Sequence, residues 1–230
     1  MIELVAFDMA GTTIDDHGLV YVALEESVRE TGATVSEPDL QRWMGTEKSS
    51  AIAALMELGG VSPGPATVDA AFGRFLEILA RSYRENPPVA LPGVEDTLRE
   101  LRMRGIAVAL TTGFSDEVAT PLLESLGWTV GVGSAHLLDA VVTTSEVTAG
   151  RPAPYLIHHA MEKTGVTDVR AVLAAGDTIV DLLAARNAGV VGVGVLTGAV
   201  GRDELAKHPH HHILRSVVDV LSLPEAGHTP

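Results

Sequence analysis

Residues 2–13 read IELVAFDMAGTT, and this short segment indicates how the rest of the chain is organised. The apolar run that ends at Phe7 is typical of a buried β-strand, and the Gly-Thr-Thr that follows is typical of a turn. Asp8 is therefore predicted at the carboxyl end of a first strand, where α/β sheets carry their reactive groups. A carboxylate beside the backbone amides of a glycine-containing loop can attack phosphorus or help to bind a metal ion. Two residues further on, the chain has Ala10 and therefore no second carboxylate.

The composition restricts the class of protein. Of the 230 residues, 46% are hydrophobic, which is enough for a large folded core. The formal net charge of −14 argues against nucleic acid and against an anionic membrane surface as partners, because both require a basic face. The absence of cysteine excludes disulfides and thiol catalysis. The sequence contains neither a signal peptide nor an apolar stretch long enough to span a bilayer, so we expect a soluble cytoplasmic protein.

Two patterns divide the chain. From about residue 18 to 86 the sequence predicts helices only, for example an apolar stripe of Leu19, Val22, Leu24 and Val28. From Pro92 onward, predicted helices alternate with predicted strands, which implies a parallel sheet with right-handed crossovers. The predicted strands are 106–111, 140–142, 169–175 and 190–196, and the helices are 94–104, 115–126, 154–163 and 179–188. We therefore predict a Rossmann-like, doubly wound α/β core at 1–16 and 88–230, with an all-helical cap domain inserted at 17–87.

Further polar groups lie at or near the carboxyl ends of the later strands. Thr111, Thr112 and Gly113 offer hydroxyls and backbone amides near a helix start, which suits a phosphate group. Arg151 supplies a cation, and Asp177 and Asp181 supply two carboxylates four residues apart. In a doubly wound sheet these strand ends meet in one crevice. Carboxylates, a hydroxyl and an arginine together predict a site for Mg²⁺ and a phosphoryl group.

Each cluster alone also has a structural interpretation. Carboxylates at a helix start compensate the helix dipole, and paired threonines at a strand end follow from β-propensity. For either of these clusters alone, the structural interpretation is favoured over the functional one. The presence of all the clusters in this order, each after the appropriate element, favours a functional site.

With these residues the chain resembles the haloacid dehalogenase superfamily of Asp-nucleophile hydrolases, and within it the phosphonoacetaldehyde hydrolase (phosphonatase) branch. The resemblance covers the whole core, and the predicted helical insert corresponds to the family's cap. Most relatives carry a second Asp where this chain has Ala10, and a lysine where it has Arg151. The matching segments are Asp8-Met9-Ala10-Gly11-Thr12, Met44-Gly45-Thr46-Glu47-Lys48, Gly150-Arg151-Pro152-Ala153-Pro154, Gly176-Asp177-Thr178 with Asp181, and Asn187-Ala188-Gly189.

The resemblance implies a role for each site residue. It implies that Asp8 is the nucleophile, that Lys48 forms a Schiff base with the substrate carbonyl, and that Arg151 assists catalysis. It further implies phosphate binding by Met9, Thr112, Gly113 and Arg151, and Mg²⁺ binding by Asp8, the Ala10 carbonyl, Asp177 and Asp181.

The placement of the lysine can be predicted from its neighbours. Thr46 is a plausible helix N-cap, which places Lys48 in the first helical turn. The structural alternative is an exposed surface lysine. The branch's archetype has a histidine where this chain has Ala51 and a tyrosine where it has Phe114.

Three functions follow from these patterns. The resemblance implies a Mg²⁺-dependent hydrolase that cleaves the C–P bond of a small 2-oxoalkylphosphonate through an aspartyl-phosphate, with an enamine as leaving group. The alternatives are a phosphatase of small esters such as phosphoglycolate, with Lys48 as a binding cation, and a non-catalytic binder of a phosphorylated metabolite. Ala10 argues against the phosphatase, because general acid catalysis is typically worth roughly 10²–10⁴-fold. The resemblance also implies a homodimer formed through the cap.

Overall fold

The structure, a computed structural model, describes residues 1–227, and the chain divides into two units. The core unit comprises Met1–Asp15 and the chain from Val89 onward, and the inserted unit comprises Asp16–Pro88. Within the described part, every helix is too short or too polar to cross a membrane.

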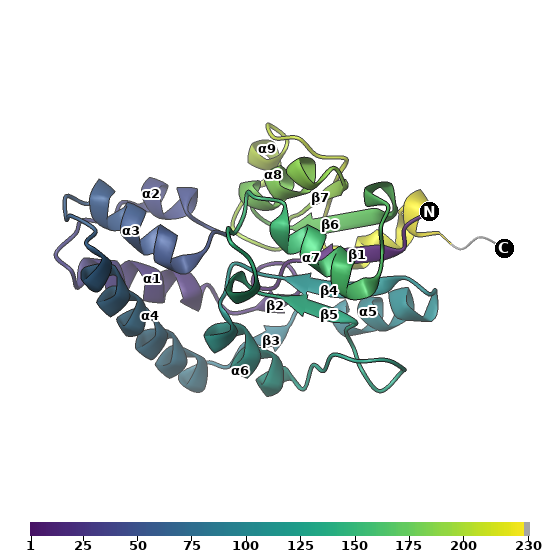
Figure 1. Ribbon diagram of the computed structural model, residues 1–230, viewed down its shortest axis with the longest axis horizontal. Coiled ribbons are helices and arrows are strands. Elements are labelled where there is room, and N and C mark those ends of the chain that lie inside the picture. Colours follow the sequence, from purple (N-terminus) through teal and green to yellow (C-terminus); the bar gives the residue numbers. More distant parts are fainter. Residues whose placement is uncertain (228–230) are drawn as a thin grey trace. The chain divides into compact units, whose positions relative to one another are not determined.

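The core unit is built on a parallel sheet, which confirms the predicted doubly wound α/β architecture (Figure 1). In the described range this sheet has six strands in the order β5-β4-β1-β6-β7-β8. The chain runs outward from β1 to β5 and then returns past β1 to β8. Right-handed crossovers therefore place α5 and α6 on one face and α7 and α8 on the other. The elements are β1 (Leu4–Phe7), α5 (Val94–Met103), β4 (Ala107–Thr111), α6 (Asp116–Leu126), β5 (Ala140–Val142), α7 (Tyr155–Thr164), β6 (Val172–Gly176), α8 (Ile179–Ala188), β7 (Val191–Val195), α9 (Arg202–Leu205) and β8 (His212–Leu214).

The central strand β1 is apolar because both of its faces are covered. Leu4 and Ala6 belong to the hydrophobic cluster that includes Leu156 of α7 and Ala184 of α8. Side chains alternate along a strand, so the remaining residues of β1 point to the other face, and they too are fully buried. A continuous apolar run is what a parallel strand buried on both faces requires.

One predicted strand begins later than expected. Residues Val169–Ala171 form a 3₁₀ turn, and β6 starts only at Val172. Asp168 accounts for the difference, because its side chain accepts a hydrogen bond from the Arg170 backbone amide at 2.9 Å and so holds the turn.

The structure contains a short pair of antiparallel strands that the sequence pattern did not predict. Ile14–Asp15 (β2) pairs with Val89–Ala90 (β3), the two segments that flank the insertion in the sequence. Two-residue strands carry no periodicity, so the pattern of the sequence gives no signal for them.

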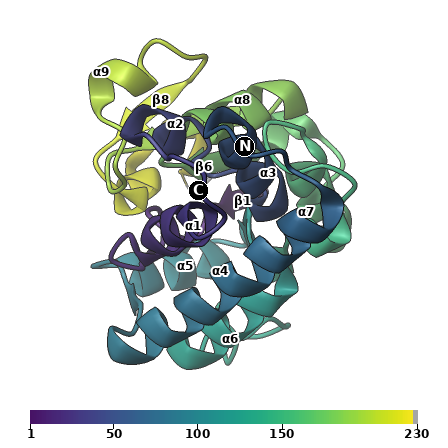
Figure 2. The ribbon, with the colours of Figure 1, turned by 90° about the vertical axis from the view of Figure 1, so that its left-hand side faces the viewer.

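The inserted unit is all-helical, in agreement with the periodicity (Figure 2). Helices α1 and α4 lie side by side, and Phe75 of α4 is fully buried. The expected stripe on α1 is partly wrong: Val20, Ala23, Leu24 and Val28 are buried, whereas Val22 is 52% exposed. The helices are α1 (Leu19–Arg29), α2 (Glu37–Arg42), α3 (Lys48–Leu58) and α4 (Pro65–Glu85).

Candidate active site

Asp8 lies where β1 ends. Phe7 pairs with Leu110 of β4 and with Ala175 of β6, so Asp8 comes level with Thr111 and Gly176 on the neighbouring strands. Its backbone amide donates to the Ala175 carbonyl at 2.9 Å, and its side chain is buried. The strand register thus fixes the nucleophile candidate at the carboxyl edge of the sheet.

The loop after Asp8 is a tight turn. The Met9 carbonyl accepts hydrogen bonds from the amides of Thr12, Thr13 and Ile14, at 2.8–3.2 Å. Gly11, inside this turn, has a φ of 83°, which favours glycine. The Met9 side chain is fully buried, so its predicted phosphate contact would have to come from its backbone amide. The Ala10 carbonyl, a predicted metal ligand, belongs to the same turn.

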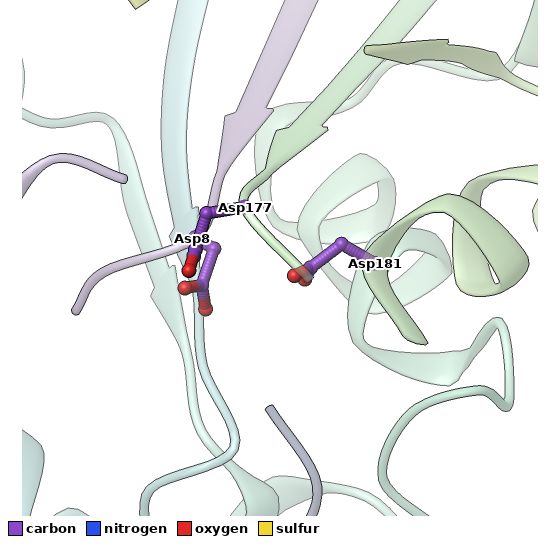
Figure 3. A group of neighbouring side chains, drawn as sticks. All are labelled: Asp8, Asp177 and Asp181. Carbon is purple, nitrogen blue, oxygen red and sulfur yellow. The ribbon is translucent and has the colours of Figure 1, made fainter. Parts of the chain in front are cut away.

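The three predicted carboxylates come together. Asp177 follows β6, Asp181 lies in the first turn of α8, and one oxygen from each lies within 4.8 Å of the others and of an oxygen of Asp8 (Figure 3). All three side chains are buried. Figure 3 shows Asp8 and Asp177 at adjacent strand ends, with Asp181 pointing toward them from its helix.

Arg151 connects this cluster to β4. Its Nη1 donates to Asp8 Oδ1 at 2.7 Å, and its Nε lies 2.9 Å from Asp181 Oδ1. Its Nη2 donates to the carbonyl and the hydroxyl of Thr111, at 2.8 and 2.9 Å. The side chain is 3% exposed, so the guanidinium is a buried cation held by fixed acceptors.

The electrostatics favour a further positive charge. Burial raises the pKa of Asp8 to about 6, with Arg151 opposing the rise and Asp181 adding to it. Burial, followed by the charges of Asp8 and Asp181, also raises the pKa of Asp177 well above its usual value. Arg151 has a raised pKa despite its burial, because Asp181 and Asp8 stabilise its charged form. When ionised, three carboxylates beside one guanidinium leave two negative charges in a buried site.

This donor set fits a divalent metal ion. All the side-chain donors are oxygens, which hard cations such as Mg²⁺ prefer, and a divalent ion would balance the remaining charge. Thr12 Oγ1 donates to Asp177 Oδ1 at 2.9 Å, which orients that carboxylate from outside the cluster. Among the described residues, this is the one group of three or more His, Cys, Asp or Glu side chains that could hold a metal.

Asp181 caps a helix and also belongs to the acidic cluster. It accepts hydrogen bonds from the amide of Thr178, at 3.0 Å, and from the Thr178 hydroxyl, which forms a capping box for α8. Its other oxygen faces Arg151. The same carboxylate therefore caps α8 and belongs to the acidic cluster.

The predicted phosphate-binding segment at the end of β4 also makes contacts within the site. The Thr112 hydroxyl accepts from the Phe114 amide at 3.1 Å and shapes the loop that contains Gly113. Thr111, which the sequence places in the same predicted phosphate-binding segment, is the residue that holds Arg151. Only the strand register, which places Thr111 level with Asp8, distinguishes it from Thr112, and the sequence gives no signal for that register.

Lys48 lies in the inserted unit as the first residue of α3, so the predicted first-turn position is correct. The predicted N-cap is wrong. Glu47 caps the helix, with its carboxylate oxygens accepting from the amides of Ser49 and Ser50, both at 2.7 Å, while the Thr46 hydroxyl donates to the Trp43 carbonyl. Lys48 is 3% exposed, which contradicts the surface-lysine alternative, and its Nζ donates to the Thr46 carbonyl at 2.8 Å.

Comparison with known proteins gives a consistent result. A family model described as haloacid dehalogenase-like hydrolase matches residues 2–189. Proteins named phosphonoacetaldehyde hydrolase are similar over most of both chains. The one from Paraburkholderia phytofirmans is 28% identical, covering 98% of this chain and 88% of its own. The one from Lactiplantibacillus plantarum is 31% identical, covering 89% of this chain and 80% of its own.

Solved structures extend the similarity to the fold. The crystal structure of a hydrolase from Pseudomonas syringae superposes with a TM-score of 0.84 at 23% sequence identity, covering 99% of this chain and all of that one. At that level of identity the likeness supports the fold alone.

Proposed function

The chain belongs to the haloacid dehalogenase-like hydrolases, in the branch similar to phosphonoacetaldehyde hydrolase, and we propose that it cleaves the C–P bond of a small 2-oxoalkylphosphonate. One observation carries the choice of reaction. Position 10, two residues after the nucleophile, is an alanine, so the first loop offers no carboxyl group to protonate an alkoxide. Leaving groups that need no such proton suit this site, and an enamine is one of them.

Asp8 supplies the nucleophile. With a pKa of about 6, its carboxylate is mostly ionised at neutral pH. Arg151 holds one of its oxygens at 2.7 Å, and this fixes the direction of attack. The other oxygen forms a bond to phosphorus as the C–P bond breaks. Water then hydrolyses the aspartyl-phosphate, which releases inorganic phosphate and restores the carboxylate.

Lys48 supplies the electron sink. Its amine condenses with the substrate carbonyl and expels water, giving an iminium ion. When the C–P bond breaks, its electron pair moves into the iminium group and gives an enamine. The enamine takes up a proton, and hydrolysis of the resulting iminium ion releases the dephosphonylated carbonyl product and the free amine. The first turn of α3 suits this role, because the positive end of a helix dipole disfavours the ammonium form.

Asp8, the Ala10 carbonyl and Asp177, with Asp181 beside them, would hold Mg²⁺ in this site. When bound, the ion would neutralise charge on the phosphoryl oxygens. Arg151, the Thr112 hydroxyl and the Gly113 amide would bind the same oxygens. The buried negative charge of the three carboxylates supports this assignment.

The test is release of inorganic phosphate from phosphonoacetaldehyde in the presence of Mg²⁺. We expect the native chain to be active, and Asp8→Ala and Lys48→Arg to be inactive with unchanged folds. Lys207→Arg is the matched control, because the Lys207 side chain is 66% exposed and paired only with Glu204 in the described structure. Borohydride in the presence of substrate should trap a covalent adduct on Lys48 and leave Lys48→Arg unmodified.

A different pattern would overturn the proposal. If the native chain is inactive on phosphonoacetaldehyde but hydrolyses p-nitrophenyl phosphate, and Lys48→Arg retains that activity, the chain is a phosphatase. If phosphorylated metabolites raise the melting temperature of the native chain and none of them is hydrolysed, the chain is a binding protein.

A further inference from the structure

The loop that follows β7 contacts the carboxylate cluster, although no sequence motif points to it. The Thr197 hydroxyl donates to the Gly11 carbonyl at 2.6 Å, which ties this loop to the turn after Asp8. The next residue, Gly198, packs directly against Asp177: a Cβ atom built on Gly198 would lie 1.8 Å from Asp177 Oδ2 and 2.5 Å from Cγ.

Space, and not backbone conformation, requires glycine at position 198. The backbone φ of Gly198 lies outside the left-handed region, so residues other than glycine can adopt its conformation. The nearest atoms that a Cβ would meet are all in the Asp177 side chain. A substitution here must therefore displace the Asp177 carboxylate or the loop itself, and either shift changes their contact.

Three residues outside the cluster contact the Asp177 carboxylate, one at Oδ1 and two on the side of Oδ2. Thr12 donates to its Oδ1 at 2.9 Å. On the side of Oδ2, Gly11 approaches so closely that a Cβ there would lie 2.6 Å away, and Gly198 approaches more closely still. The Thr197 hydrogen bond joins the two glycine-bearing loops. The position of this carboxylate thus depends on two loops that are 186 residues apart in the sequence.

We infer that Thr197 and Gly198 are positioning residues for the metal site, which set the Asp177 carboxylate at its distance from Asp8 and Asp181. The inference rests on the proposed metal-dependent function and adds the loop after β7 to its apparatus. Substituting a residue that contacts and orients a metal ligand typically lowers metal affinity or activity by roughly 10–100-fold. We expect an effect of that size.

The test measures the Mg²⁺ dissociation constant by isothermal titration calorimetry, together with the melting temperature of the metal-free protein. We expect Gly198→Ala to weaken Mg²⁺ binding by roughly 10–100-fold. Gly201→Ala is the matched control: it changes the same loop by the same group, but a Cβ there would meet no atom within 4 Å, and we expect native affinity.

Thr197 provides a second, independent comparison that depends on a single hydroxyl. We expect Thr197→Val to weaken Mg²⁺ binding and Thr197→Ser, which keeps the hydroxyl, to restore it. Both variants should melt close to the native temperature, which a purely structural role of the loop would not predict.

The outcomes separate the inference from the function on which it rests. Native affinity in Gly198→Ala overturns the inference, and so does equal affinity in Thr197→Val and Thr197→Ser if Gly198→Ala fails to fold. In both cases the metal-dependent function stands. If the native chain binds no Mg²⁺, the proposed metal site itself is wrong, and the inference falls with it.

Discussion

Replacing Arg151 by methionine is expected to destabilise the core unit by about 3–5 kcal/mol in the absence of divalent metal. The guanidinium makes four contacts at 2.7–2.9 Å, two of them to carboxylates, and its side chain is 3% exposed. Methionine removes the charge and leaves Asp8 and Asp181 buried without their cation. For a chain of this length, that loss corresponds to a fall in melting temperature of about 6–20 °C.

Thermal unfolding at about pH 8, with EDTA and then with millimolar Mg²⁺, measures this effect. Arg170→Met is the matched control, because Arg170 pairs with Asp168 at 2.8 Å but its side chain is 86% exposed. Exposed ion pairs contribute about 0–1 kcal/mol, so this variant should melt near the native temperature. Arg151→Lys keeps the charge but has a single nitrogen for acceptors on three residues, and we expect it to melt between the native protein and Arg151→Met.

A loss below about 1 kcal/mol in Arg151→Met without metal would refute this reasoning. Such a result would mean that the buried carboxylates of Asp8 and Asp181 do not need the positive charge of Arg151 for the core unit to be stable. Mg²⁺ gives a second criterion. Because the ion would replace the missing positive charge, it should stabilise Arg151→Met more than the native chain.

Three further predictions concern pH, the inserted unit and its helix caps. The pKa of Asp8 rises from 3.8 to about 6 on folding, so the folded state binds more protons at this carboxyl, and the contribution of Asp8 to metal-free stability should fall as pH rises through this range. The difference in urea unfolding midpoint between the native chain and Asp8→Asn measures this contribution. A difference that grows in favour of the native chain as pH rises would contradict the prediction. Phe75→Ala should destabilise the inserted unit by about 3–5 kcal/mol in urea, because a fully buried ring is removed. Glu47→Ala should lose about 0.5–2 kcal/mol by the same measurement, through loss of the α3 cap.

Much of the fold could be predicted because periodicity reports burial. The apolar run of β1 and the alternation after Pro92 both follow from a sheet covered on two faces. The 3₁₀ turn at Val169–Ala171 could not be predicted in this way, because its apolar residues look like the start of the strand. A single side chain, that of Asp168, decides between the two conformations.

The candidate site shows a similar division. The approach of Asp8, Asp177 and Asp181 follows from parallel strand ends, so their convergence could be predicted. The choice of Thr111 over Thr112 as partner of Arg151 depends on strand register, which adjacent threonines do not reveal. The close packing of Gly198 on Asp177 depends on two distant loops, and a glycine alone carries no information about what lies beside it.

The small ladder formed by β2 and β3 has a consequence for the modular construction of the chain. The segments leaving and re-entering the core unit are hydrogen-bonded neighbours, with Ile14 opposite Ala90 and Asp15 opposite Val89. Antiparallel partners lie about 5 Å apart, a span that a two-residue hairpin turn can close. The core unit therefore closes on itself at this ladder, so a change in the length of the insert would not need to alter the register of the sheet or the positions of the aspartates at its edge.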